Sequence, residues 1–223
     1  MSYMKISYLF LSLLLTGSFL SCNKFTASDP KGPPAGAKII YFPVITRVGL
    51  AAMSVVKGTP FTDPGVKAEV NGQAVPVTID GTVNTAEVGP YTLTYTASNK
   101  DGYQATATRI VWVIPGPETS TADFSGTYAP VGGSAPANAV ITKLDKGLYY
   151  TSNCWGGGSS VTIAVYFFCL DGTTLTVPEQ VTTVGHVKST PDGTYVGGLI
   201  TWTIDREDFQ AGGLILTKKW QKQ

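Results

Sequence analysis

The sequence has little of what most active sites and nucleic-acid interfaces are built from. It contains 1 histidine and 3 cysteines among 223 residues. Charged residues make up 14% of the chain, against about 25% in typical soluble proteins, and the formal net charge is +1. The longest run of basic residues is Lys218-Lys219. A nucleic-acid partner is therefore not expected, because binding to phosphates requires a concentrated basic surface.

The single histidine, His186, has none of the sequence signals of a catalytic or metal site around it. It lies in the apolar stretch Gly185-His186-Val187, without the elbow and acid of a serine triad. A zinc site needs three or four ligands, and one histidine with two separated cysteines has no recognised zinc-site spacing. Asp205, Glu207 and Asp208 cluster, but a turn between strands explains them more simply. We expect no enzymatic activity, no metal and no cofactor.

Long apolar runs are also missing, except for Ile6–Leu15 behind Lys5. This run is too short to span a membrane and has the length of a signal-peptide core. The following Thr16-Gly17-Ser18-Phe19-Leu20-Ser21-Cys22 resembles the lipobox of bacterial lipoproteins, although Phe19 replaces the more usual leucine. We expect a signal peptide at 1–21 and acylation of Cys22, which would anchor the chain in the outer membrane. The alternative is an ordinary cleaved signal.

Residues 22–37 are rich in Pro, Gly, Ala and Ser and predict a flexible tether. Display on the cell surface is the favoured orientation. Asn23-Lys24-Phe25 follows the cysteine, where the export signals of comparable lipoproteins place acidic residues, so the periplasmic face remains the alternative.

What is plentiful is the pattern of β-structure. Between 38 and 115, seven strand-like runs are separated by turn pairs such as Asn71-Gly72 and Asp101-Gly102, and residues 91–97 alternate strictly between large side chains and small or hydroxyl-bearing ones. The pattern predicts a β-sandwich of about seven strands. Arg109 shares strand parity with Val111 and Val113, so we expect either a bulge or a head group that reaches water.

Motifs in this segment occur in a specific order. Phe61-x-Asp63-Pro64-Gly65-Val66-x-Ala68 is followed by Gly89-x-Tyr91-Thr92-x-Thr94-Tyr95 and by Thr108-Arg109-x-Val111-x-Val113. They resemble a bacterial immunoglobulin-like domain found in envelope lipoproteins of Bacteroidota. The resemblance covers about a third of the chain and implies a spacer, not an enzyme.

A second set of β-runs begins after the Pro-containing linker 116–122. About eight runs in 123–223 predict an antiparallel barrel or a second sandwich, so the chain is expected to be all-β. Phe124-Ser125-Gly126-Thr127-Tyr128 and Ile200-x-Trp202-x-Ile204-Asp205 resemble C-terminal domains of the same lipoproteins, more weakly than the first match.

Two features of this half are candidates for a site. Cys154 and Cys169 predict either a disulfide in an oxidising compartment or two buried free thiols. Trp155 lies in the Gly- and Ser-rich segment 152–160, beside Asn153 and near Tyr150. These three residues are either contacts to a ligand, or Trp155 folds back to plug the end of a barrel.

The functional expectation is a non-catalytic, membrane-anchored binding protein, with a glycan as the favoured ligand. Many lipoproteins of this kind are encoded beside polysaccharide-uptake systems, which is an association and not an argument from a site. The alternative is a structural or assembly component that binds another envelope protein through its sheets.

Overall fold

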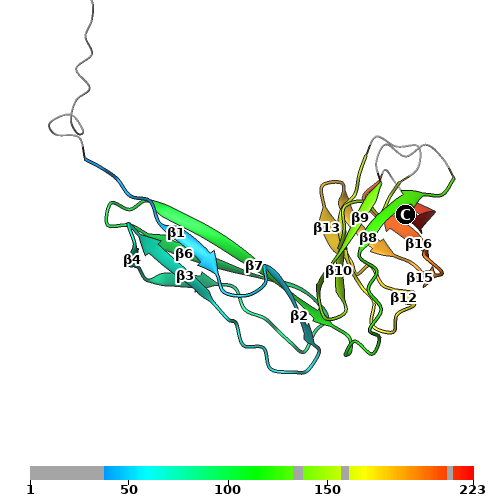
Figure 1. Ribbon diagram of the computed structural model, residues 1–223, viewed down its shortest axis with the longest axis horizontal. Helices are drawn as coiled ribbons and strands as arrows, with labels where there is room; N and C mark the ends of the chain where they lie inside the picture. The colour runs from blue at the N-terminus through cyan, green and yellow to red at the C-terminus, as the bar shows by residue number, and fades with distance from the viewer. Residues whose placement is uncertain (1–37, 133–137, 157–160, 210–212) are drawn as a thin grey trace, which may run out of the picture. The chain divides into compact units, whose positions relative to one another are not determined.

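The computed structural model describes residues 38–132, 138–156, 161–209 and 213–223. Tyr41–Gln223 belong to one unit, which contains two groups of strands (Figure 1). The secondary structure in the described residues consists of strands without helices, which confirms the all-β prediction. No helix long and apolar enough to cross a membrane therefore occurs in these ranges. The predicted signal peptide, Cys22 and the tether lie outside the described residues.

The N-terminal sandwich has seven strands in two sheets, as predicted. One sheet has the order β1-β3-β4, and the other has the order β2-β7-β6-β5, in which β2 runs parallel to β7. The strands are β1 (Val44–Arg47), β2 (Ala52–Val56), β3 (Val66–Val70), β4 (Gln73–Ala74), β5 (Val77–Asp80), β6 (Gly89–Ser98) and β7 (Gln104–Ile114).

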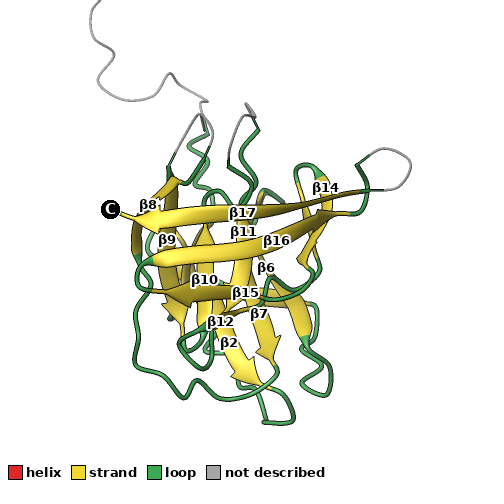
Figure 2. Ribbon diagram, turned by 90° about the vertical axis from the view of Figure 1, so that its right-hand side faces the viewer, coloured by secondary structure: helices red, strands yellow, loops and turns green. Residues whose placement is uncertain are grey.

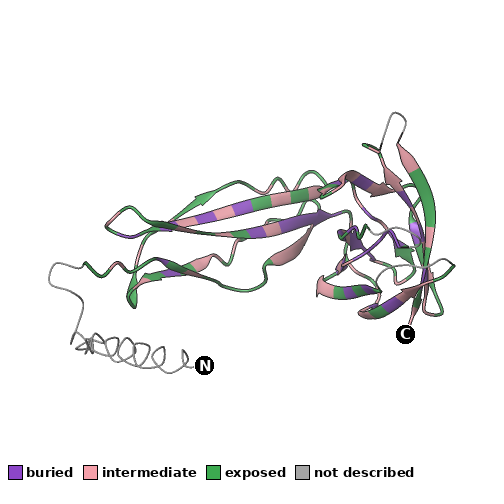
Figure 3. Ribbon diagram, turned by 90° about the horizontal axis from the view of Figure 1, so that it is seen from above, coloured by how far each residue is buried: buried purple, intermediate pink, exposed green. Residues whose placement is uncertain are grey.

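Alternation of small and large side chains decides which face of each long strand is buried. Along β6, Leu93, Tyr95 and Ala97 are buried while their neighbours are not, and Figure 3 shows this alternation along the long strands. Leu93, Tyr95 and Val111 form the centre of the small core between the two sheets. The core is small, so polar contacts between the sheets contribute more to their alignment.

Arg109 is the main polar contact between the sheets, and both expectations for it are wrong. β7 pairs with β6 without a bulge, and the Arg109 side chain is 0% exposed. Its Nη2 donates to the carbonyls of Val48 (2.7 Å) and Gly65 (3.0 Å). Its Nε donates to the Tyr95 hydroxyl (3.0 Å) and lies 3.3 Å from the Asp63 carboxylate. Its Nη1 also lies 2.9 Å from the Met53 Sδ, and a buried guanidinium is tolerated because these five acceptors surround it.

The C-terminal barrel has ten strands. Eight of them follow one antiparallel path, β11-β10-β9-β8-β17-β16-β14-β13, and Figure 2 shows β16 and β17 side by side. They are β8 (Gly126–Pro130), β9 (Ala139–Asp145), β10 (Leu148–Thr151), β11 (Val165–Phe168), β13 (Gln180–Thr182), β14 (Gly185–Ser189), β16 (Leu199–Arg206) and β17 (Leu214–Lys222). The short strands β12 (Thr174–Leu175) and β15 (Gly193–Val196) pair with each other, and β15 also pairs with β16.

The barrel is nearly closed by contacts of β11 with the segment that runs from β12 to β13. Phe168 and Thr176 exchange two backbone hydrogen bonds of 2.8 and 3.0 Å. The Gln180 side chain makes the two hydrogen bonds that a neighbouring strand would make to Tyr166. Its Oε1 accepts from the Tyr166 N–H (2.9 Å), and its Nε2 donates to the Tyr166 carbonyl (2.8 Å). These bonds satisfy backbone groups that would otherwise form an open edge.

Side chains that point into the barrel form its core. Its largest buried side chains include Tyr128, Tyr149, Phe167, Trp202 and Trp220. Another cluster joins the barrel to the sandwich: Trp112 of β7 packs edge-on against Phe168, with ring centroids 5.5 Å apart. The Ser54 N–H donates to the Asp145 carboxylate (2.8 Å) beside this cluster.

Replacement of Arg109 by Met tests the polar contact between the sheets. We expect Arg109→Met to lower the free energy of unfolding by about 3–5 kcal/mol, because the Asp63 carboxylate loses its cationic partner and the Val48 carbonyl loses its donor. Chemical denaturation followed by fluorescence measures the change. Arg47→Met is the matched control, since Arg47 is exposed and makes one 3.3 Å bond to the Thr108 carbonyl. A loss below about 1 kcal/mol for Arg109→Met would contradict this role.

Candidate functional site

The structure brings two of the three predicted contact residues together and separates the third. Trp155 is 4% exposed and Asn153 is 1% exposed, and both belong to the inside of the barrel. Tyr150 is on the outer face of β10, where its ring lies 5.5 Å from that of Tyr166. Trp155 therefore fills one end of the barrel instead of projecting from an exposed loop.

Asn153 fixes the path of the segment that carries Trp155. Its Oδ1 accepts from the backbone N–H groups of Trp155 (3.0 Å), Gly156 (3.3 Å) and Ile163 (3.3 Å). The carbonyl of the intervening Cys154 accepts from the Trp202 indole N–H at 3.0 Å. One side-chain oxygen thus gathers three donors of an irregular buried segment, which gives this segment a defined conformation.

Gly156 allows the segment to lie directly on the barrel wall. Its φ is +53°, and a Cβ at this position would lie 2.4 Å from the Trp220 ring. A larger residue would therefore both strain the backbone and displace the indole.

Two cations contact the Trp155 ring, and sequence reasoning missed both. The Arg206 guanidinium lies 5.0 Å from the ring centroid, and the Lys218 ammonium lies 4.4 Å from it. The Lys218 Nζ also lies 3.5 Å from the Gly156 carbonyl. We call the arrangement of Asn153, Trp155, Gly156, Arg206 and Lys218 the Trp155 end of the barrel.

Strand parity explains why Arg206 and Lys218 face inward. The same alternation in the sequence could have predicted this inward position. Ile200, Trp202 and Ile204 are buried on β16, and Arg206 continues the same face. Lys218 pairs with Trp202 across the β16–β17 ladder, so it shares that face, whereas Lys219 is exposed. Both cations remain half-buried.

Burial changes the electrostatics of this end. Desolvation lowers the pKa of Lys218, because the charged form loses water. Burial raises the pKa of the Cys154 thiol to about 12, although Arg206 and Lys218 act to lower it. Cys154 is therefore an unreactive thiol at neutral pH.

The disulfide alternative for Cys154 and Cys169 is not what the structure contains. Both cysteines are free and buried, which corresponds to the other alternative. Burial also raises the pKa of Cys169, to about 11. The two thiols belong to the same apolar core cluster, where they pack as small hydrophobic groups.

His186 has an acidic partner that the sequence did not reveal. Its Nδ1 lies 2.7 Å from the Asp208 carboxylate, which also accepts the His186 backbone N–H at 2.8 Å. The hydrogen bond to Asp208 raises the pKa of His186. Gly185 permits this approach, since a Cβ there would lie 2.6 Å from the carboxylate. Across the described ranges, no cluster of three or more His, Cys, Asp or Glu side chains could hold a metal ion.

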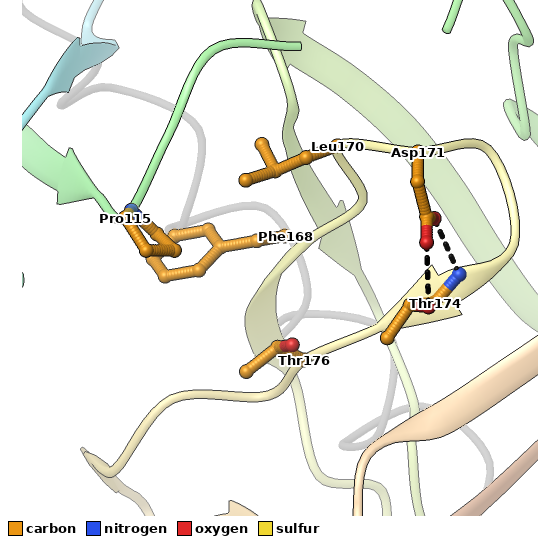
Figure 4. Close-up of a pocket in the computed structure, with 6 residues that line it drawn as sticks. All are labelled: Pro115, Phe168, Leu170, Asp171, Thr174 and Thr176. Atoms are coloured by element: carbon orange, nitrogen blue, oxygen red, sulfur yellow. Dashed lines mark hydrogen bonds between the residues drawn. The ribbon is translucent and has the colours of Figure 1, made fainter. Parts of the chain in front are cut away.

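A small cavity of about 200 Å³ lies elsewhere, between Pro115 and the β11–β12 segment (Figure 4). Phe168 and Leu170 supply much of its apolar lining. The Asp171 carboxylate is directed at Thr174 and accepts from its N–H and its hydroxyl, both at 2.7 Å. These hydrogen bonds lower the pKa of Asp171 to about 2. The cavity is smaller than usual ligand sites, and its charged group is already occupied by a turn.

Truncation of Trp155 tests whether it fills the barrel end. We expect Trp155→Ala to lower the free energy of unfolding by about 3–5 kcal/mol, because a buried indole leaves a cavity. Phe209→Ala is the control, since the half-buried Phe209 ring contacts the same guanidinium at 4.6 Å. Its loss is expected to stay near 1 kcal/mol or below. Equal, small losses for both variants would mean that Trp155 is not a packing element.

The single histidine makes the Asp208 contact measurable by NMR titration. We expect the pKa of His186 to exceed its ordinary value of 6.5 and to fall toward that value in Asp208→Asn. Because the folded pKa is raised, the stabilising contribution of the pair is complete below the unfolded pKa. It is lost as the pH rises through the folded pKa. An unchanged His186 titration in Asp208→Asn would contradict the contact.

Comparisons with known proteins agree with the architecture of the N-terminal sandwich. Residues 45–113 match the model of the family described as "Bacterial surface protein, Ig-like domain". No curated protein matches the chain. A lipoprotein of Bacteroides thetaiotaomicron, known from a crystal structure, aligns over 81% of this chain and 100% of its own at 28% identity, with a TM-score of 0.43. At that TM-score the backbones of the two proteins superpose only in part. The assignment of the Ig-like domain therefore rests on the observed strands and on the family match. Residues 45–113 are accordingly a bacterial surface Ig-like domain.

Proposed function

We propose that the chain is a non-catalytic, lipid-anchored envelope protein that binds a glycan at the Trp155 end of its barrel. In this proposal the Ig-like domain acts as a spacer between the membrane and the barrel. The lipid would be attached at Cys22, behind the signal-like run Ile6–Leu15. The description of the matched family, a bacterial surface protein, supports an envelope location.

The observation that carries the proposal is a concentration of hydrogen-bond donors without acceptors. Four buried side-chain nitrogens among the described residues have no partner, and three of them lie around the Trp155 segment: Asn153 Nδ2, Arg206 Nε and Trp220 Nε1. Asn153 bonds to this segment, Arg206 lies over Trp155, and Trp220 lies against Gly156. Unpaired buried donors are costly, and they are satisfied when an oxygen-rich ligand or its bound water supplies acceptors.

Glycans fit this donor set because they carry many oxygen acceptors on a compact ring. A guanidinium and an ammonium are half-buried here, and both groups can donate hydrogen bonds to hydroxyl or carboxyl oxygens. The ring of Trp155 is already covered, so we expect hydrogen bonds and charge to contribute more than stacking on this indole.

A panel of neutral and acidic polysaccharide fragments, titrated calorimetrically against the full chain in detergent, tests the proposal. We expect at least one class to bind and Arg206→Gln to weaken it by about tenfold or more, as loss of a charged hydrogen-bond donor predicts. Arg47→Gln in the sandwich is the matched control and is expected to leave binding unchanged. Failure of every glycan to bind would sink the proposal.

The second candidate, a component that binds another envelope protein, draws support from exposed apolar side chains. Val181 on β13 is 74% exposed and Val196 on β15 is 70% exposed. A contiguous apolar patch, and not single exposed residues, is what indicates contact with another protein surface, so this candidate requires these side chains to act together. Copurification of a single envelope protein, lost in Val181→Lys, together with an empty glycan panel, would favour this candidate.

A further inference from the structure

The Trp155 end holds two positive charges on one aromatic ring. Arg206 and Lys218 extend from adjacent strands, β16 and β17, and their charged groups lie 5.0 and 4.4 Å from the Trp155 centroid. An indole face attracts a cation, but it carries no net charge and cannot neutralise two of them. Arg206 and Lys218 therefore create a local positive potential at the Trp155 end of the barrel.

No carboxylate in the described part of the chain forms an ion pair with either cation. The nearest acids in sequence are engaged elsewhere or face outward. Glu207 pairs with Lys188, and Asp208 pairs with His186. Asp205 has the opposite strand parity to Arg206 and lies across from Lys188. The positive charge at this end is thus uncompensated within these residues.

Partial burial raises the free-energy cost of this uncompensated charge. Lys218 is half-buried and its pKa is lowered by desolvation, so its charged form is destabilised in the free protein. An anion that approaches Arg206 and Lys218 would offset the electrostatic cost of this desolvation. The unpaired N–H groups of Asn153, Arg206 and Trp220 are a separate observation with the same meaning, because each of them requires an acceptor.

We infer that the glycan recognised at the Trp155 end is acidic, and that the carboxylate of a uronic acid unit binds between the Arg206 guanidinium and the Lys218 ammonium. This inference rests on the proposed function and specifies the class of glycan. The planar guanidinium matches the two oxygens of a carboxylate, and the ammonium supplies a point charge beside them. A neutral sugar would leave both cations unpaired.

Matched pairs of oligosaccharides that differ only in charge test the inference. Oligomers of galacturonate, glucuronate and mannuronate are titrated against the full chain, each as the free acid and as its methyl ester. The ester keeps the ring and its hydroxyls but removes the negative charge. We expect at least one acid to bind about tenfold or more tightly than its ester, and raised salt to weaken the acid alone.

Variants of the two cations locate the effect. Lys218→Gln and Arg206→Gln are expected to reduce the preference for acid over ester, whereas Lys218→Arg retains it. Lys219→Gln is the matched control, because Lys219 is the next residue on β17 and is exposed. Thermal melting of each variant shows whether it is folded, and the acid–ester comparison on the unaltered chain does not depend on the variants.

The outcomes separate the inference from the proposed function. Equal binding of acids and esters overturns the inference while glycan binding stands. Binding of neutral glycans in the wider panel without any binding of uronates has the same consequence. If no glycan of either kind binds, the proposed function fails and the inference fails with it. An acid preference that Lys218→Gln and Arg206→Gln leave intact also overturns the inference, since it places the carboxylate elsewhere.

Discussion

A positive charge inside a protein must find acceptors, and this requirement explains the contrast between the two halves of the chain. Arg109 is completely buried, but two carbonyls, a hydroxyl and the Asp63 carboxylate surround it, and it connects the two sheets of the sandwich. Arg206 and Lys218 are only half-buried, yet they contact an indole and no carboxylate within the described residues. The protein itself supplies acceptors to the Arg109 guanidinium, whereas the Arg206 Nε has no acceptor.

The geometry of the barrel produces the second arrangement from ordinary strand rules. Parity places Arg206 and Lys218 on the inner face of adjacent strands, in line with the buried Trp202 and Trp220. The segment after β10 then covers this face, and it does so because Gly156 fits against Trp220. Two inward cations and the hydrogen-bonded segment around Trp155 therefore meet at one end of the barrel. The Asn153 amide holds that segment in place through three backbone donors.

Local patterns in the sequence were sufficient for much of the fold. Alternation along 91–97 and the turn pairs predicted the seven-stranded sandwich, and regular spacing predicted a β-domain of about eight strands. The candidate site was harder, because it depends on contacts between distant residues. The composition of 152–160 indicated a loop at Trp155. The burial of the Trp155 ring, however, depends on Arg206 and Lys218, which are more than fifty residues away in the sequence. The His186–Asp208 contact spans 22 residues, and Arg109 needed acceptors from two loops.

The cations at the Trp155 end are difficult to explain as packing alone. Apolar side chains of similar length at 206 and 218 would cover Trp155 without the desolvation that lowers the pKa of Lys218. Half-buried charges without a counter-charge cost the free protein desolvation energy, which the proposed ligand would offset. The N-terminal sandwich offers no comparable incompletely paired charge within its described residues, since its one buried cation is fully coordinated. In the proposed function, recognition therefore belongs to the barrel, with the sandwich as its support.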